Sequence, residues 1–293
     1  MQTAESLRRT LAVTGELHSV VKTMKALAGV NIRQYERAAH AVAEYNRTVE
    51  MGLQIVAQAS WPARATPKGK LGVVVFGSDQ GMCGQLNDQV VAYATRALGK
   101  LAYRHPDQLT VAAGVRAAGQ LEASGRVVEK CVEVPSSVAG IAAAVEEALR
   151  IVDDWHFSRG VAFVVLFYAH PVSGAWYRIR GVRLLPVDRE WIHSLKARPW
   201  PSKCIPAFTM PQPDLLAALI REYLFVSLFR AFAESLASEN ASRLASMQVA
   251  ERNIEERLHA LTAESRQLRQ TAIASELLDI VSAYEALREP KSR

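Results

Sequence analysis

Apolar residues recur every seven positions along the first sixty residues. One series comprises Leu7, Thr14, Val21, Ala28, Tyr35, Val42, Val49 and Val56; a second comprises Thr10, Leu17, Met24, Asn31, Ala38, Tyr45 and Gly52. Two series at this spacing share one helix face and are typical of a coiled-coil seam. The pattern predicts a long helix over residues 1–60, with small and partly polar residues at its contact face.

The last eighty residues repeat this pattern. One series comprises Leu244, Glu251, Leu258, Ser265 and Ala272; the other comprises Met247, Ile254, Leu261, Leu268 and Ser275. No Pro or Gly lies between Pro213 and Pro290, and these two residues cost a helix interior about 3 and about 1 kcal/mol. A second long helix is therefore predicted over residues 214–293. Near residue 270 the apolar spacing slips, so we expect the buried face to rotate there.

Short apolar runs alternate with amphipathic segments in the middle of the chain. Strands are predicted at 71–76, 109–113, 127–134, 161–168 and 176–185. Helices are predicted at 85–104 and from Ser136 or Ser137 to Val152, with a separate short helix that ends at Leu121. This order is typical of an α/β domain. The predicted fold class is α/β: a long antiparallel coiled coil (1–60 and 214–293) with an inserted Rossmann-like α/β domain (61–213). A homodimeric coiled coil is the alternative pairing.

Composition excludes several classes of protein. The 293 residues are 49% hydrophobic with a net charge of +6, which is too apolar for a disordered chain. Residues 61–213 hold 18 basic and 12 acidic residues, but no run of five like charges occurs, so no nucleic-acid partner is expected. No apolar stretch approaches the ~20 residues of a membrane span. We expect a soluble protein without a signal peptide.

The segment Gly77–Gly84 follows a predicted strand and precedes a predicted helix. That position resembles a phosphate-binding turn, but the segment fits neither G-x-G-x-x-G nor the P-loop pattern. The alternative is a tight turn in which Ser78 or Asp79 caps the following helix. Cys83 would need a neighbouring His to act as a nucleophile, and no pairing is readable. No catalytic residue, metal or cofactor is expected.

Four stretches carry a family resemblance. Glu234–Met247 reads E-S-L-A-S-E-N-A-S-R-L-A-S-M, Arg269–Val281 reads R-Q-T-A-I-A-S-E-L-L-D-I-V, Ser78–Asn87 reads S-D-Q-G-M-C-G-Q-L-N and Lys22–Ala28 reads K-T-M-K-A-L-A. In this order they resemble the gamma subunits of F-type ATP synthases. Asp79, Gly81, Cys83 and Gly84 match the turn motif of that family.

The resemblance implies a non-catalytic rotor shaft. Its partners would be the alpha and beta subunits of the catalytic hexamer, the epsilon subunit and the membrane c-ring, at the cytoplasmic face of a bacterial inner membrane. Ion flow through the ring would be coupled to ATP synthesis or hydrolysis. The residues implied to contact the hexamer are Met24, Lys25, Arg269, Gln270, Ile273 and Glu276.

The sequence also departs from the family pattern. Gln80 replaces an Arg of the turn, Glu16-Leu17 replace an Asn-Thr pair, and Ala274 replaces a Thr. One interpretation is a divergent gamma subunit of an alternate ATPase complex. Two other functions stay open: a soluble nucleotide-binding α/β enzyme that uses the Gly77–Gly84 turn, and a coiled-coil adaptor unrelated to ATPases.

Overall fold

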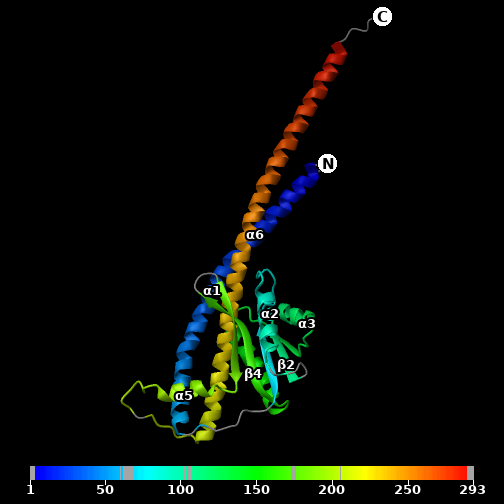
Figure 1. Cartoon of the computed structure of the whole chain (residues 1–293). Helices are drawn as coiled ribbons and strands as arrows, with labels where there is room; N and C mark the ends of the chain where they lie inside the picture. The colour runs from blue at the N-terminus through cyan, green and yellow to red at the C-terminus, as the bar shows by residue number, and fades with distance from the viewer. Residues whose placement is uncertain are drawn as a thin grey trace. The chain divides into compact units, whose positions relative to one another are not determined.

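Each end of the chain forms one long helix. In the computed structural model, α1 spans Ala4–Ala59 and α6 spans Gln212–Arg288 (Figure 1). The structure describes residues 4–59, 61, 69–101, 103, 107–172, 176–204 and 206–288. Pro213 lies in the first turn of α6, where its missing N–H breaks no helical hydrogen bond. The prediction of long terminal helices around a central sheet is confirmed.

The chain divides into two compact units. The larger unit is Leu27–Ala245, and the smaller unit combines Met1–Ala26 with Ser246–Arg293. Each unit contains a part of α1 and a part of α6, and each is described by itself below. Within the described ranges, no helix is long and apolar enough to cross a bilayer.

A five-stranded sheet forms the centre of the larger unit. Its strands are β1 (Lys70–Phe76), β2 (Gln108–Ala113), β3 (Lys130–Val132), β4 (Val161–Val172) and β5 (Trp176–Leu185). Their spatial order is β3-β2-β1-β4-β5. The first four are parallel, and β5 pairs antiparallel with β4 at the edge. All five lie where the sequence predicts a strand.

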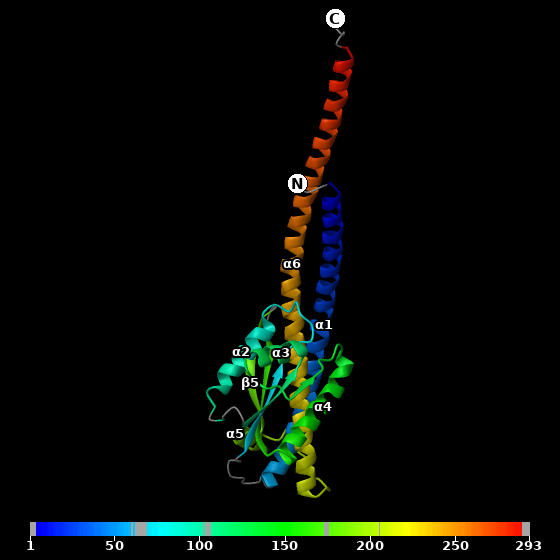
Figure 2. The same cartoon turned by 90° about the vertical axis from the view of Figure 1, so that its right-hand side faces the viewer.

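Helices cover both faces of the sheet (Figure 2). On one face, α2 (Leu86–Leu98) and α3 (Val115–Ala123) bury an apolar cluster with β1 and β4. On the other face, α4 (Val138–Phe157) and the first half of α6 share a second cluster with the sheet. Phe76 of β1 makes edge-on ring contacts there with Tyr168 and with Phe232 of α6. The first half of α6 is therefore part of the core of the α/β region.

The helices α1 and α6 run antiparallel within the larger unit. Asn31 contacts Asn240, whereas Tyr45 contacts Glu222, so positions that advance along α1 retreat along α6. At Gly52 a Cβ atom would lie 2.7 Å from a methyl group of Leu219. A larger side chain at this position would require the end of the Leu219 side chain to move.

A helix that the sequence pattern did not predict lies in the larger unit. The helix α5 spans Arg189–Ala197, and the Asp188 carboxylate caps it by accepting a hydrogen bond from the Glu190 N–H at 3.1 Å. Ile192 and Leu195 bury against Leu53 and Ala57 of α1.

In the smaller unit, the two helices again share a buried face. All members of the first α1 series from Leu7 to Val21 are buried or half-buried, as are the α6 positions from Met247 to Leu268 in both predicted series. The second α1 series is wrong at its first two positions, because Thr10 and Leu17 are exposed while Leu11 and His18 are half-buried. Its next member, Met24, is half-buried as predicted. From Arg269 to Tyr284, every described residue of α6 is exposed.

Candidate functional site

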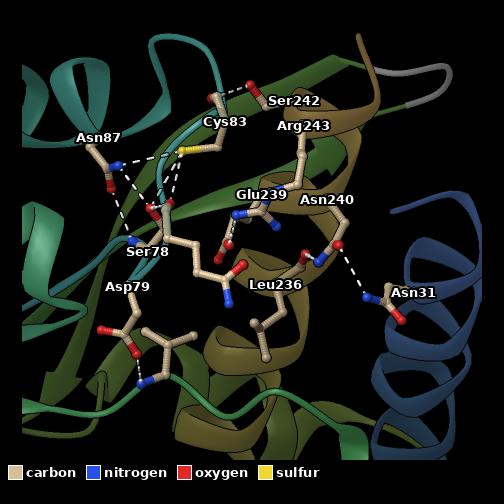
Figure 3. Close-up of polar contacts among 12 residues, drawn as sticks. Asn31, Ser78, Asp79, Cys83, Asn87, Leu236, Glu239, Asn240, Ser242 and Arg243 are labelled. Atoms are coloured by element: carbon tan, nitrogen blue, oxygen red, sulfur yellow. Dashed lines mark hydrogen bonds and ion pairs between the residues drawn. The ribbon is translucent and has the colours of Figure 1, made fainter. Parts of the chain in front are cut away.

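The turn after β1 is held by a network of short side-chain hydrogen bonds (Figure 3). The Asn87 amide donates to Ser78 Oγ at 2.8 Å and accepts from the Ser78 N–H at 3.0 Å. The Ser78 hydroxyl in turn donates to the Gln80 carbonyl at 2.8 Å. Gly84 has φ +58°, a left-handed conformation that glycine adopts without strain. These contacts fix a rigid turn. At Gly81 a Cβ atom would lie 3.6 Å or more from its nearest neighbours, so the space around this position does not require glycine.

Asp79 has a different role from the one expected. Its two carboxylate oxygens accept hydrogen bonds from the N–H groups of Val115 and Val134, each at 2.8 Å. Val115 is the first residue of α3, so Asp79 ties the turn to that helix N-terminus and to the chain after β3. The prediction that Ser78 or Asp79 caps the next helix is wrong, because α2 has Gln85 at its N-cap position and no side-chain cap.

Cys83 is part of this network. The side chain is buried, and the sulfur lies 3.4 Å from Ser78 Oγ, 3.5 Å from Asn87 Nδ2 and 3.8 Å from the Gln80 carbonyl oxygen. None of these partners is a base that could take the thiol proton. The arrangement suits a packed structural thiol, because an activated cysteine needs an electropositive, accessible setting.

The helix α6 occupies the place where a ligand would bind in an open parallel sheet. Such ligands bind beyond the carboxyl ends of the strands, at the point where the strand order reverses. Here that point lies between β1 and β4, since β2 and β3 extend the sheet on the other side of β1. Ser238 of α6 reaches the Ala169 carbonyl of β4, and Ser242 reaches the Cys83 carbonyl after β1. The geometry therefore argues against a nucleotide site at the Gly77–Gly84 turn.

A buried ion pair lies on the same stretch of α6. Arg243 Nη2 donates to Glu239 Oε1 at 2.6 Å, and both residues are less than 10% exposed. Burial raises the pKa of Glu239, and Asp79 adds to the rise, although Arg243 opposes it. Within the described part of the chain, Glu239 Oε2 and Arg243 Nε have no hydrogen-bond partner. Burial, followed by the Glu239 charge, also raises the pKa of Tyr35 on α1.

The sequence analysis missed the way these residues converge. Asn240 contacts Asn31 through its side-chain oxygen, 3.4 Å from Asn31 Nδ2, so the same segment of α6 also contacts α1. Every residue from Ala231 to Arg243 is buried, including seven polar ones. A run of buried polar residues in a helix is the signal that could have indicated this junction, because such groups need partners.

The implied hexamer-contact residues all lie in the smaller unit. Met24 and Lys25 are half-buried, and the Lys25 ammonium forms an ion pair with Glu251. Arg269, Gln270 and the other C-terminal candidates, Ile273 and Glu276, are exposed on the part of α6 that no other described residue covers. The structure thus leaves the C-terminal four accessible and gives Lys25 a partner within the chain.

One group among the described residues has the composition of a metal site. A ligand atom from each of His18, Glu251 and Glu255 lies within 4.8 Å of the other two. Lys25 already pairs with Glu251, and this hydrogen bond holds the pKa of Glu251 below its usual range. A cation would have to displace that ammonium, so the group fits an ionic contact between α1 and α6 better than a metal centre.

Comparisons with known proteins identify the family. A family model described as ATP synthase matches residues 3–287, and curated relatives of nearly full length are named ATP synthase gamma chain. The chain belongs to the ATP synthase gamma-chain family. The gamma chain of Thermobifida fusca is 27% identical over 96% of this chain and 95% of its own length. That of Nautilia profundicola is 23% identical over 99% and 100%.

Solved structures share the fold of this gamma-chain family member. A chain of the Euglena gracilis mitochondrial ATP synthase, in a structure of OSCP, F1 and c-ring, has a TM-score of 0.58 and 17% identity, with 99% of both chains covered. A chain of the Tetrahymena thermophila central stalk and c-ring has a TM-score of 0.56 and 17% identity, covering 79% of this chain and 99% of its own. As a gamma chain, the protein is a non-catalytic stalk subunit of ATP synthase.

Proposed function

We propose that the chain is the central rotor shaft that couples ion flow through a membrane ring to ATP synthesis or hydrolysis in a catalytic hexamer. The observation that carries this proposal is the exposed end of α6. Ile273, Leu277 and Ile280 are 49%, 58% and 65% exposed in a gamma chain matched over residues 3–287. An apolar surface of this kind is typical of a segment that another protein covers.

The proposed architecture is an antiparallel coiled coil with a Rossmann-like insert. Its parts are residues 1–60, 61–213 and 214–293. The seven-residue spacing of buried positions on both helices supports a coiled coil. The mostly parallel sheet with helices on both faces supports the Rossmann-like assignment.

The proposed partners are the alpha and beta subunits around the helices, and the epsilon subunit and c-ring at the α/β insert. The insert carries the excess positive charge of the chain, which favours a place near an anionic membrane surface. The complex would sit at the cytoplasmic face of a bacterial inner membrane, with this chain peripheral. Asymmetric faces of a turning shaft would bind the three catalytic sites differently, and such differential contact is what shifts their states.

Six residues are proposed to contact the hexamer. Met24 and Lys25 would lie near the lever of a catalytic subunit, and Arg269 and Gln270 would bind a loop of it. Ile273 and Glu276 would line the tip of the shaft. The exposure of the four C-terminal residues supports this assignment, because nothing else in the described chain uses them.

Reconstitution with alpha and beta subunits tests the proposal. We expect the purified chain alone to hydrolyse no ATP and to co-purify with the hexamer. We also expect the variant Arg269→Ala, Gln270→Ala to lower the ATPase activity of the assembled complex by more than the matched variant Arg266→Ala, Gln267→Ala, which removes the same side chains one turn earlier.

Robust ATP turnover by the isolated chain would favour an enzyme and refute the rotor proposal. Failure to co-purify with any hexamer would refute the shaft role of this chain. Equal activity of the two double variants in complexes of the same composition would remove the proposed loop contact but leave the shaft role intact.

A further inference from the structure

Three polar side chains on α6 follow one another at intervals of four residues. They are Glu234, Ser238 and Ser242, and all three are less than 9% exposed. Side chains four residues apart lie on the same face of a helix. Two of the three residues contact neighbouring positions of β4, and the third contacts the turn after β1.

Each contact reaches far along the sequence. Glu234 Oε2 lies 2.7 Å from Nδ1 of His170 on β4, and Ser238 Oγ lies 3.1 Å from the Ala169 carbonyl oxygen. The Ser242 hydroxyl donates to the Cys83 carbonyl at 2.6 Å (Figure 3). Ser238 Oγ also lies 2.8 Å from the Glu234 carbonyl of its own helix, so its proton is shared between two acceptors.

The contacts are placed at the end of the larger unit. The fully buried stretch of α6 stops at Arg243, and the boundary between the two compact units follows Ala245. Beyond this point, α6 has no contact with the sheet within its own unit. Ser242 thus lies three residues before this boundary.

Directional contacts resist rotation in a way that apolar contacts do not. Apolar burial depends on the area removed from water and has little directional preference. A hydrogen bond weakens steeply once its angle or distance departs from the preferred geometry. Three bonds along one face fix the angle of α6 about its own axis.

We propose that Glu234, Ser238 and Ser242 form the contact through which torque passes between the α/β region and the shaft helix. The inference rests on the rotor function proposed above and adds the positioning residues that hold the shaft angle. Without them, the catalytic subunits would still turn the helix. Under an opposing load, the sheet would then rotate through a smaller angle than the helix.

The test compares two variants in the complete membrane complex. The variant Ser238→Ala, Ser242→Ala removes both hydroxyl contacts. The control Ser235→Ala removes a hydroxyl that is equally buried, at 3% exposure, but has no hydrogen-bond partner among the described residues. A third variant, Ser242→Thr, keeps the donor. Subunit composition, ATP hydrolysis and ion pumping are measured for each, first without and then against an increasing ion gradient.

We expect the double variant to assemble and to hydrolyse ATP at the wild-type rate without a gradient. Its ions pumped per ATP should fall at least twofold as the gradient rises, while Ser235→Ala and Ser242→Thr stay at the wild-type ratio. If the double variant does not assemble, Ser242→Ala alone takes its place.

A constant wild-type ratio at every gradient would overturn the proposal. A loss of hydrolysis equal to the loss of pumping would also overturn it, because that result would show only a weakened fold. A wild-type chain that joins no hexamer would refute the rotor function itself, and the junction proposal with it, before any variant is compared.

Discussion

Replacing Asp79 should destabilise the larger unit, because this one carboxylate joins three separate segments. In the variant Asp79→Ala, the N–H groups of Val115 and Val134 lose their acceptor. In the wild type, each donates a hydrogen bond of 2.8 Å to a carboxylate oxygen of Asp79. Hydrogen bonds to a charged group contribute about 1.5–3 kcal/mol each, and a carboxylate at a helix N-terminus adds about 0.3–1 kcal/mol. Asp79 is only half-buried, so water replaces part of this loss. The expected cost is about 2–3 kcal/mol.

Urea unfolding of the purified chain, followed by circular dichroism, measures this cost. With a slope of about 2 kcal/mol per molar urea, the midpoint should fall by about 1 M. The variant Asp79→Asn keeps one acceptor and should lose about half as much. Amide hydrogen exchange should show faster exchange at Val115 and Val134 in particular.

The control for this experiment is Asp88→Ala. Asp88 also lies in a first helical turn and accepts one hydrogen bond, from Gln120 at 2.8 Å, but on the exposed surface. We expect it to cost about 0.5 kcal/mol. If Asp79→Ala lowers the midpoint no more than Asp88→Ala does, the assignment of Asp79 as a tie between segments is wrong.

Three further predictions concern single side chains. Because burial raises the pKa of Glu239, its contribution to stability is full below its usual range near 4.5 and is lost as pH rises through the folded-state pKa. Glu239→Gln should abolish this slope in urea titrations and, by leaving Arg243 without a charged partner, cost about 3 kcal/mol at neutral pH. Burial and the Glu234 charge raise the pKa of Tyr168 to about 12, so the ultraviolet difference titration against Tyr168→Phe should show a midpoint near that value; a midpoint near 10 would contradict it. Met82 has φ +61° and is exposed, so Met82→Asn should raise the unfolding free energy by about 0.5 kcal/mol in the same urea assay, and a decrease would show that this conformation is not strained.

The heptad pattern was sufficient to predict the long helices and most of their contact face, but not every position of it. The first α1 series is buried because it contacts α6, whereas Leu17 of the second series is exposed and His18 takes its place. A one-residue error of this kind arises because a seven-residue spacing does not distinguish between two adjacent positions such as Leu17 and His18. Which of them is buried depends on how α6 packs against α1. The helix α5 was missed for a related reason: it has nine residues and only two buried side chains.

The candidate site was predictable in its residues but not in its contacts. The sequence marks Ser238 and Ser242 only as part of a motif that resembles the family. It does not predict their partners Ala169 and Cys83, which lie 69 and 159 positions away. Periodicity reports only which residues share a helix face. Asp79 shows the same limit, because a capping residue is expected to act on the next helix, whereas its partners lie 36 and 55 residues further on.

The uncovered end of α6 also has a consequence for how the purified chain responds to proteases. Residues 269–284 are all exposed, and a helix of this length without tertiary contacts is marginal in water. This end should therefore fray more readily than the rest of α6, and proteases cleave frayed segments first. Limited proteolysis of the purified chain should thus cut within this segment before it cuts the buried stretch from Ala231 to Arg243.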